Sequence, residues 1–244
     1  MSIPRPINPF DVGKEGLSIH TFCDASRDAY AAVIFMRAES SSGTSVRLVQ
    51  VKSRVAPLKR TKDKEGVKEE RRLTIPRLEL LAATIGARLT QSTVQALDWS
   101  DVPVHYWSDS TTVIAWIQRN EDWCTFVGNR VREVLKLTSA EDWRHVPGKK
   151  NPADLPSRGC SAAQFLSSRW WEGPEWLYKA KEEWPASSGD VDKAEVEAER
   201  KKTTQVMTVN SKPPWFVPRF SSYRKNVNVM GWISRFIENL KKPR

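Results

Sequence analysis

The sequence predicts an α/β domain in which five strands form a sheet flanked by helices. Three β-prone runs come first with short turns between them, which is typical of an antiparallel meander. A long helical pattern follows, and a fourth β-prone run then passes directly into another helix. The predicted order is therefore β-β-β-α-β-α-α-β-α. The strands are expected at residues 17–24, 29–37, 46–52, 103–109 and 143–146, and the helices are expected to begin near residues 75, 111, 125 and 153.

Individual residues justify these elements. The run at residues 29–37 is apolar at both parities, so both faces of that strand should be buried. Pro76 lies in the first turn of the long helix, where proline is tolerated. Apolar residues recur every three or four positions from Ile75 to Leu89, and Glu79 lies close to this stripe.

Composition limits the class of protein. The chain has 244 residues, with 39 Lys and Arg against 29 Asp and Glu, and its net charge of +10 favours a polyanionic partner, nucleic acid before an anionic membrane. Its three cysteines are scattered, which predicts no disulfide framework and a reducing compartment. Since neither a signal peptide nor a run of about 20 apolar residues is present, the expected location is intracellular, cytoplasmic or nuclear.

Changes in composition predict the domain boundaries. The main domain is expected to include a charged loop and to end in a tryptophan-rich extension that packs on it rather than stacking on bases. A charged linker and a basic amphipathic helix should follow. The predicted parts are a lead-in at residues 1–16, the domain at 17–185 with its loop at 52–72 and its extension at 161–185, the linker at 186–213 and the helix region at 214–244.

Four acidic residues stand at strategic places in this order. Asp24 ends the first strand, Glu79 lies in the long helix, Asp109 ends the fourth strand and Asp154 opens the late helix. Four carboxylates would repel one another if they converged, so convergence requires cations, and Mg²⁺ prefers oxygen ligands. Two such ions would bracket a phosphodiester. The alternative at residues 108–109 is that Ser108 or Asp109 only caps the following helix.

The segments around these acids resemble the ribonuclease H region of Pao/BEL-type retrotransposon polyproteins. The resemblance covers roughly residues 17–185, and a later stretch is similar to the segment that precedes the integrase in such polyproteins. The segments are TFCDAS at 21–26, KSRVAPLK at 52–59, TIPRLELLAA at 74–83, YWSDS at 106–110, NPADLPSRG at 151–159, WWEGPEWL at 170–177 and, before the integrase, residues 219–237.

The resemblance implies a ribonuclease H-like fold with a mixed five-stranded sheet, and metal-dependent endonucleolytic hydrolysis of the RNA strand of RNA–DNA hybrids. It implies two Mg²⁺ ions, replaceable by Mn²⁺, on Asp24, Glu79, Asp109 and Asp154, with Asp24 and Asp109 holding metal most directly. The RNA would be selected through its 2′-hydroxyls. The implied partners are the hybrid, a reverse transcriptase and an integrase of the same polyprotein, with no membrane. Candidate substrate contacts are Ser26, Ser110, Lys149, Lys150, Asn151 and Arg158.

Two features of the sequence depart from the pattern of the family that it resembles. A charged insertion precedes Ile75, and His145 comes before the Val-Pro turn rather than after it, so a structural role is predicted for this histidine.

Two other functions stay open. The chain could instead be an inactive fragment or a co-opted nucleic-acid-binding module, or a basic scaffold that binds partners through its last helix. Deletion of residues 186–244 should leave hydrolysis intact if the chain is a ribonuclease H, and should abolish partner binding if it is a scaffold. The sequence has no motif for a zinc finger, an aspartic protease, a nucleophile with a histidine base, or a phosphate-binding loop.

Overall fold

The computed structural model describes residues 13–62, 68–186, 190–201 and 222–241. The chain divides into two compact units, Met1–Lys201 and Lys202–Arg244. Most of the predicted lead-in and much of the predicted linker therefore lie outside the described residues, as do the first residues of the predicted C-terminal region.

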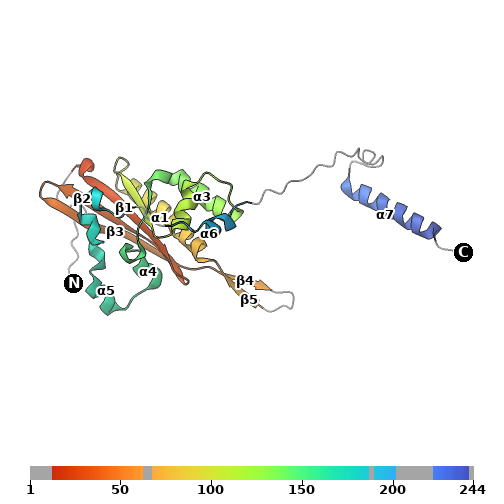
Figure 1. Ribbon diagram of the computed structural model, residues 1–244, viewed down its shortest axis with the longest axis horizontal. Coiled ribbons are helices and arrows are strands. Elements are labelled where there is room, and N and C mark those ends of the chain that lie inside the picture. Colours follow the sequence, from red (N-terminus) through yellow and green to blue (C-terminus); the bar gives the residue numbers. More distant parts are fainter. Residues whose placement is uncertain (1–12, 63–67, 187–189, 202–221, 242–244) are drawn as a thin grey trace. The chain divides into compact units, whose positions relative to one another are not determined.

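The main sheet of the first unit is mixed and has five strands in the order β3-β2-β1-β6-β7 (Figure 1). β1 pairs antiparallel with β2, and β2 with β3, whereas β1–β6 and β6–β7 are parallel. The fold class predicted from the sequence is thus confirmed. The strands are β1 Leu17–Ala25, β2 Ala29–Ser40, β3 Gly43–Val55, β6 Val104–Ser108 and β7 Trp143–His145.

The helices begin close to the predicted positions, and additional short turns follow the last strand. The α-helices are α1 Ile75–Ala96, α2 Thr111–Gln118, α3 Thr125–Leu137, α4 Asp154–Arg158, α5 Ala162–Ser168, α6 Lys193–Ala198 and α7 Tyr223–Leu240. The 3₁₀ turns are Lys14–Gly16, Ala140–Asp142, Gly148–Lys150, Trp170–Glu172, Glu175–Tyr178 and Lys181–Glu183.

The two faces of the sheet are covered by different parts of the chain. Helices α1, α2 and α3 pack on the face that includes Ile19 and Cys23 of β1. The tryptophan-rich extension covers the other face, where Trp176 and Trp184 pack with Phe22 of β1. Because successive side chains of a strand point to opposite faces, the doubly apolar β2 lies buried between these two layers.

The predicted charged loop at residues 52–72 is wrong over most of its length. β3 continues to Val55, and β4 Leu58–Lys62 pairs antiparallel with β5 Lys68–Arg72 as a separate hairpin (Figure 1). Charge density predicted a solvated loop because it carries no information about backbone pairing.

The predicted linker is also wrong where it is described, since residues 190–201 pack on the domain. Val196 of α6 is fully buried, and its carbonyl accepts a bond of 3.3 Å from Trp116 Nε1. The Cys124 amide donates to the Glu199 carbonyl at 2.7 Å. One apolar residue in a charged run gives little signal in the sequence, yet it fixes this segment in the core.

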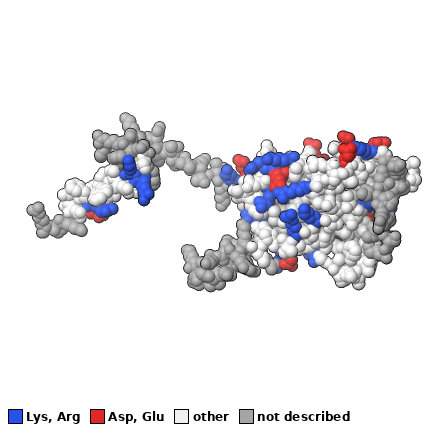
Figure 2. Space-filling view, turned by 180° about the vertical axis from the view of Figure 1, so that it is seen from behind, with Lys and Arg blue, Asp and Glu red and all other residues white. Residues whose placement is uncertain are grey.

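The second unit contains the amphipathic helix α7. Its apolar residues Trp232, Phe236 and Leu240 are exposed, and Arg224, Lys225, Arg235 and Lys241 give it a basic character, visible as blue side chains in Figure 2. None of the described helices has both the length and the apolar character needed to cross a membrane.

Candidate active site

Asp109 follows the end of β6, at the junction with α2. Ser110 caps α2, because its Oγ accepts a bond of 3.2 Å from the Val113 amide, and the Ser110 amide donates to Ser108 Oγ at 3.2 Å. The alternative in which Ser108 or Asp109 caps the helix is therefore wrong. The Asp109 carboxyl instead accepts a bond of 3.3 Å from Asn151 Nδ2.

Asp24 lies next to Asp109 because β1 and β6 are parallel neighbours, with Cys23 paired to Ser108. The Asp24 side chain is buried, and a side-chain hydrogen bond joins it to the Asp109 carboxyl. Ser157 Oγ donates a second bond to Asp24. Burial raises the pKa of Asp24, and the charge of Asp154 raises it further. The same two effects, burial and then the charge of Asp24, raise the pKa of Asp109 to about 7.

Glu79 approaches this pair from the first turns of α1. Burial raises the pKa of Glu79 to about 7, and the carboxylates of Asp109, Asp24 and Glu195 add to the rise. A side-chain hydrogen bond to Ser110 opposes this shift. The negative charges of Asp24 in β1 and of Asp109 after β6 therefore act on Glu79 in α1.

Asp154 lies at the beginning of α4 and is less buried, with 45% of its side chain exposed. Arg158, one helical turn later, forms an ion pair with it. Within the described residues, no group of three or more His, Cys, Asp or Glu side chains is arranged to hold a metal ion. The charges of the four acids nevertheless affect one another's pKa values. Ser157 is hydrogen-bonded to Asp24, and Arg158 is ion-paired with Asp154.

The chemistry of the donors nevertheless fits a hard divalent cation. Asp24, Glu79 and Asp109 offer carboxylate oxygens, which Mg²⁺ prefers. Burial, followed by the charge of neighbouring acids, raises their pKa values, so a cation at this position would stabilise the ionised carboxylates.

The predicted substrate contacts divide into two groups. Ser110 and Asn151 are buried, and Ser26 Oγ donates to the Ser157 carbonyl at 2.7 Å, so these three polar groups serve internal bonds. Lys149 and Lys150 are exposed in the turn before α4. Arg158 is exposed as well, but it pairs with Asp154.

Two further residues lie near the acids, and a role was predicted from the sequence only for His145. Glu195 of α6 accepts a bond of 2.5 Å from Thr112 Oγ1 at the start of α2, and its position in a predicted linker gave no signal. His145 of β7 bonds to the backbone of Asp109, and burial lowers the pKa of His145. This contact supports the structural role that its position before the Val-Pro turn predicted.

A family model described as "Pao retrotransposon-like RNaseH-like domain" matches residues 1–110. This part of the chain matches the Pao retrotransposon family. The match confirms the resemblance for the motifs up to residue 110 and includes Asp24, Glu79 and Asp109. Asp154 and the motifs from residue 151 onward lie beyond the matched residues.

Solved structures of ribonuclease H proteins are similar to the same domain. RNase H1 from the halophilic archaeon Halobacterium salinarum NRC-1 is 15% identical, with a TM-score of 0.33 over 56% of this chain and 89% of that chain. LC11-RNase H1, solved in complex with an RNA/DNA hybrid, is 17% identical, with a TM-score of 0.34 over 57% and 91%. The N-terminal RNase H domain of a Mycobacterium tuberculosis protein is 11% identical, with a TM-score of 0.33 over 56% and 91%. A comparison with curated proteins finds no match.

Proposed function

We propose that this chain hydrolyses the RNA strand of RNA–DNA hybrids as part of a retrotransposon polyprotein. The observation that carries the proposal is the pair of carboxyl groups of Asp24 and Asp109, which lie side by side where two adjacent parallel strands end. Burial and then the charge of Asp24 raise the pKa of Asp109. Both lie in the residues that match the RNaseH-like family. Polar groups at such strand ends are a recurrent position for catalysis in α/β proteins.

Asp24 and Asp109 would hold a divalent cation most directly, with Glu79 on the substrate side and Asp154 completing a second cation position. Bound Mg²⁺ or Mn²⁺ would supply an activated water and stabilise the leaving oxygen of the phosphodiester. The chain's own residues bring the negative charge together and keep the acids partly shielded from water. Asp24 and Asp109 would both have to be ionised to hold the cation, because ligating carboxylates bind in their deprotonated form.

Two side-chain movements belong to this proposal. Asp24 would turn from the Ser157 hydroxyl toward the cation, and Asp154 would exchange its ion pair with Arg158 for a cation contact. Arg158 is exposed, so its release costs little, and it would then be free to contact a phosphate of the substrate. The same movements would explain why the acids adjoin one another without forming a metal-binding group.

Recognition of the substrate would depend on charge and on the sugar. Lys and Arg side chains would bind the phosphates of the DNA strand, which requires no base sequence. The 2′-hydroxyls in the wide minor groove of the hybrid would identify the RNA strand. The implied partners are therefore the hybrid and the neighbouring enzymes of a polyprotein.

The test uses an RNA–DNA hybrid labelled separately on each strand, the full chain, and Mg²⁺ or Mn²⁺, with the Asp109→Asn variant as the matched control. We expect metal-dependent loss of the RNA strand alone, with 3′-hydroxyl and 5′-phosphate ends, and no cleavage by the variant. Equal cleavage by both proteins would exclude Asp109 from the reaction. Hybrid binding without cleavage in either metal would favour a nucleic-acid-binding module that has lost, or never had, activity by itself.

A further inference from the structure

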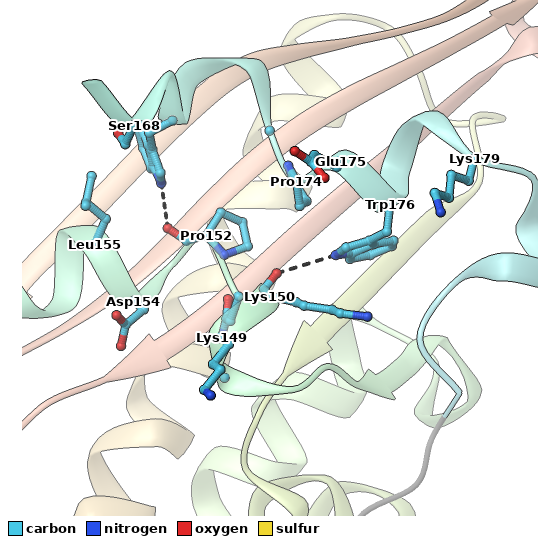
Figure 3. Close-up of a pocket in the computed structure, with 14 residues that line it drawn as sticks. Lys149, Lys150, Pro152, Asp154, Leu155, Ser168, Pro174, Glu175, Trp176 and Lys179 are labelled. Atoms are coloured by element: carbon cyan, nitrogen blue, oxygen red, sulfur yellow. Dashed lines mark hydrogen bonds between the residues drawn. The ribbon is translucent and has the colours of Figure 1, made fainter. Parts of the chain in front are cut away.

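A pocket of about 520 Å³ opens beside Asp154, between the turn at residues 148–154 and the tryptophan-rich extension (Figure 3). Lys149 and Lys150 line it from the turn, and Lys179 lines it from the extension. Pro174 and Trp176 form an apolar part of its wall. Asp154 at the edge of this lysine–tryptophan pocket belongs to the candidate site, whereas the proposed reaction assigns no role to Lys179, Pro174 or Trp176.

The turn that carries the two lysines is fixed on both sides. Asn151 Nδ2 donates to the Cys23 carbonyl at 3.0 Å, and Asn151 Oδ1 accepts from the Ala153 amide at 3.1 Å. From the extension, Trp170 Nε1 donates to the Pro152 carbonyl at 2.7 Å, and Trp176 Nε1 donates to the Lys150 carbonyl at 3.5 Å (Figure 3). The pocket therefore exists before any ligand arrives.

The extension itself is anchored to the sheet, so the second wall of the pocket is also fixed. Arg37 of β2 is buried and donates from Nε to the Leu177 carbonyl at 2.8 Å, and from its guanidinium to the Lys179 carbonyl at 3.3 Å. These bonds hold the backbone of Lys179 while its ammonium stays exposed near Glu183, at 3.6 Å. A buried arginine thus positions a lysine at the pocket.

The charges of the pocket fit a phosphate better than a cation. Lys149 and Lys150 are exposed on the turn, and Lys179 adds a third positive charge, which is paired with Glu183 at 3.6 Å. Two acids also line the pocket, but Asp154 is paired with Arg158, which leaves Glu175 as the opposing charge. An anionic group would meet lysines, and a flat or apolar group attached to it would meet Pro174 and Trp176. A nucleotide combines these two properties, and the volume lies in the range of about 300–1,000 Å³ that is usual for small-ligand sites.

We propose that the lysine–tryptophan pocket binds one nucleotide of the nucleic-acid strand that passes the candidate catalytic acids. Lys149 and Lys150 bind its phosphate, and its sugar or base lies against Pro174 and Trp176. This inference rests on the proposed function for the identity of the strand. It assigns the extension a second role beyond packing, since its two indole groups hold the lysine turn in place beside Asp154.

The first test measures binding of an RNA–DNA hybrid to the full chain by fluorescence anisotropy over a range of NaCl concentrations, in the Asp109→Asn background so that no cleavage intervenes. Adding Lys149→Gln and Lys150→Gln should weaken binding at least about tenfold near 0.1 M salt, and should reduce the salt slope by about 2. Replacing both lysines by arginine keeps the charges and should preserve affinity. Replacing Arg132 and Lys136 of α3 by glutamine removes the same charge elsewhere and should have a smaller effect.

The second test places a single 4-thiouridine at successive positions of the RNA strand and identifies the crosslinked peptide by mass spectrometry. One position should crosslink to the peptides that contain Lys149 or Trp176. Unchanged affinity and salt slope in the glutamine variant, or crosslinks spread evenly along the strand, would overturn the pocket. If the wild-type chain cleaves hybrid while these results are negative, the pocket fails and the proposed function stands. If it does not cleave but the lysine effect and the crosslink appear, the pocket stands and hydrolysis fails.

Discussion

Ionisation of Asp109 is strongly disfavoured in the folded protein. Its carboxyl shares a hydrogen bond with Asp24, and burial followed by the charge of Asp24 raises its pKa from 3.8 to about 7. Between about pH 4 and 7 the folded chain therefore binds a proton that the unfolded chain has released. Because stability falls with pH wherever the folded state binds more protons, this carboxyl destabilises the metal-free protein as the pH rises through that window.

The Asp109→Asn variant should therefore be more stable than the wild type at pH 8 in EDTA, by on the order of 1 kcal/mol or more. At pH 4 the difference should nearly vanish, because the wild-type carboxyl is then neutral as well. Urea denaturation at the two pH values measures both quantities. Added Mg²⁺ should raise the melting temperature of the wild type more than that of the variant, since a ligand stabilises only the state that binds it. A gain in stability that is equal at both pH values would contradict the electrostatic explanation.

The elements that the sequence predicted best are those with a clear period and clear ends. The helix expected to begin near residue 125 is observed as α3 Thr125–Leu137, and the five strands of the main sheet lie within a few residues of their predicted positions. The hairpin β4–β5 and the docked helix α6 were missed, because each is a charged segment whose order depends on backbone pairing or on a single buried valine. Periodicity detects an apolar face, and these two segments have almost none.

Helix α1 approaches β1 so closely that the contact requires glycine. A Cβ atom on Gly86 would lie 2.5 Å from Cys23 Sγ and 3.3 Å from Thr21 Cγ2. Cys23 is buried next to Asp24, so its sulfur has little space to move. Packing at this point thus links the position of α1, which carries Glu79, to the strand that carries Asp24.

Gly86→Ala should consequently destabilise the chain by about 1–3 kcal/mol, even though alanine favours a helix by about 1 kcal/mol over glycine. Cys23→Ala shortens the opposing side chain and should relieve the clash with the new methyl group. The double variant Gly86→Ala/Cys23→Ala should therefore lose less stability than the sum of the losses of the two single variants. Thermal or urea denaturation of the four proteins completes this double-mutant cycle. A stabilising effect of Gly86→Ala alone would show that the helix shifts freely on the sheet.

The docking of α6 changes the expectation for truncated chains. Removal of residues 187–244 deletes the buried Val196, the Arg77–Glu199 ion pair at 2.6 Å and the Thr112–Glu195 bond at 2.5 Å. We expect this truncation to cost about 2 kcal/mol or more, because full burial of a valine contributes about that amount. A chain that ends at Lys201 keeps all three contacts and should melt like the full chain. Equal melting temperatures for both truncated chains would mean that residues 190–201 are not part of the folded domain.

At the scale of the whole molecule, the candidate site joins positions that are far apart in the sequence. Asn151 reaches Cys23 across 128 residues, and Ser157 reaches Asp24 across 133. The position of each acid at a strand end or in a helix marked it as a candidate site residue. The sequence did not show that these segments, which are far apart in the chain, are joined by hydrogen bonds. The four acids were grouped through the resemblance of the surrounding motifs, and the contribution of Glu195 became visible only in the fold. The sequence therefore predicted the residue types of the site better than the bonds that hold them.

The net charge is distributed unevenly between the two units. Residues 202–244 hold nine of the 39 basic residues and one of the 29 acidic residues, so they carry +8 and leave +2 for residues 1–201. Figure 2 agrees with this division, because both signs of charge appear on the first unit, whereas the described part of the second is mainly basic. General attraction to a polyanion should thus come from the C-terminal unit, while the carboxylates and the lysine–tryptophan pocket belong to the first.

Truncation at Lys201 should separate these two contributions to nucleic-acid binding. Each phosphate contact that is lost lowers the salt slope by about 0.9 on duplex nucleic acid, so removal of several basic residues should flatten the dependence of affinity on salt by several units. Under the proposed function, the preference for hybrid over double-stranded DNA should remain, because the proposed 2′-hydroxyl contacts would be made at the candidate site. Anisotropy titrations of both chains with both duplexes, from low to moderate salt, measure slope and preference together. If truncation removed the preference for hybrid and left the salt slope unchanged, substrate selection would have to be assigned to the C-terminal unit. The acids of the first unit would then determine cleavage but not which duplex is bound.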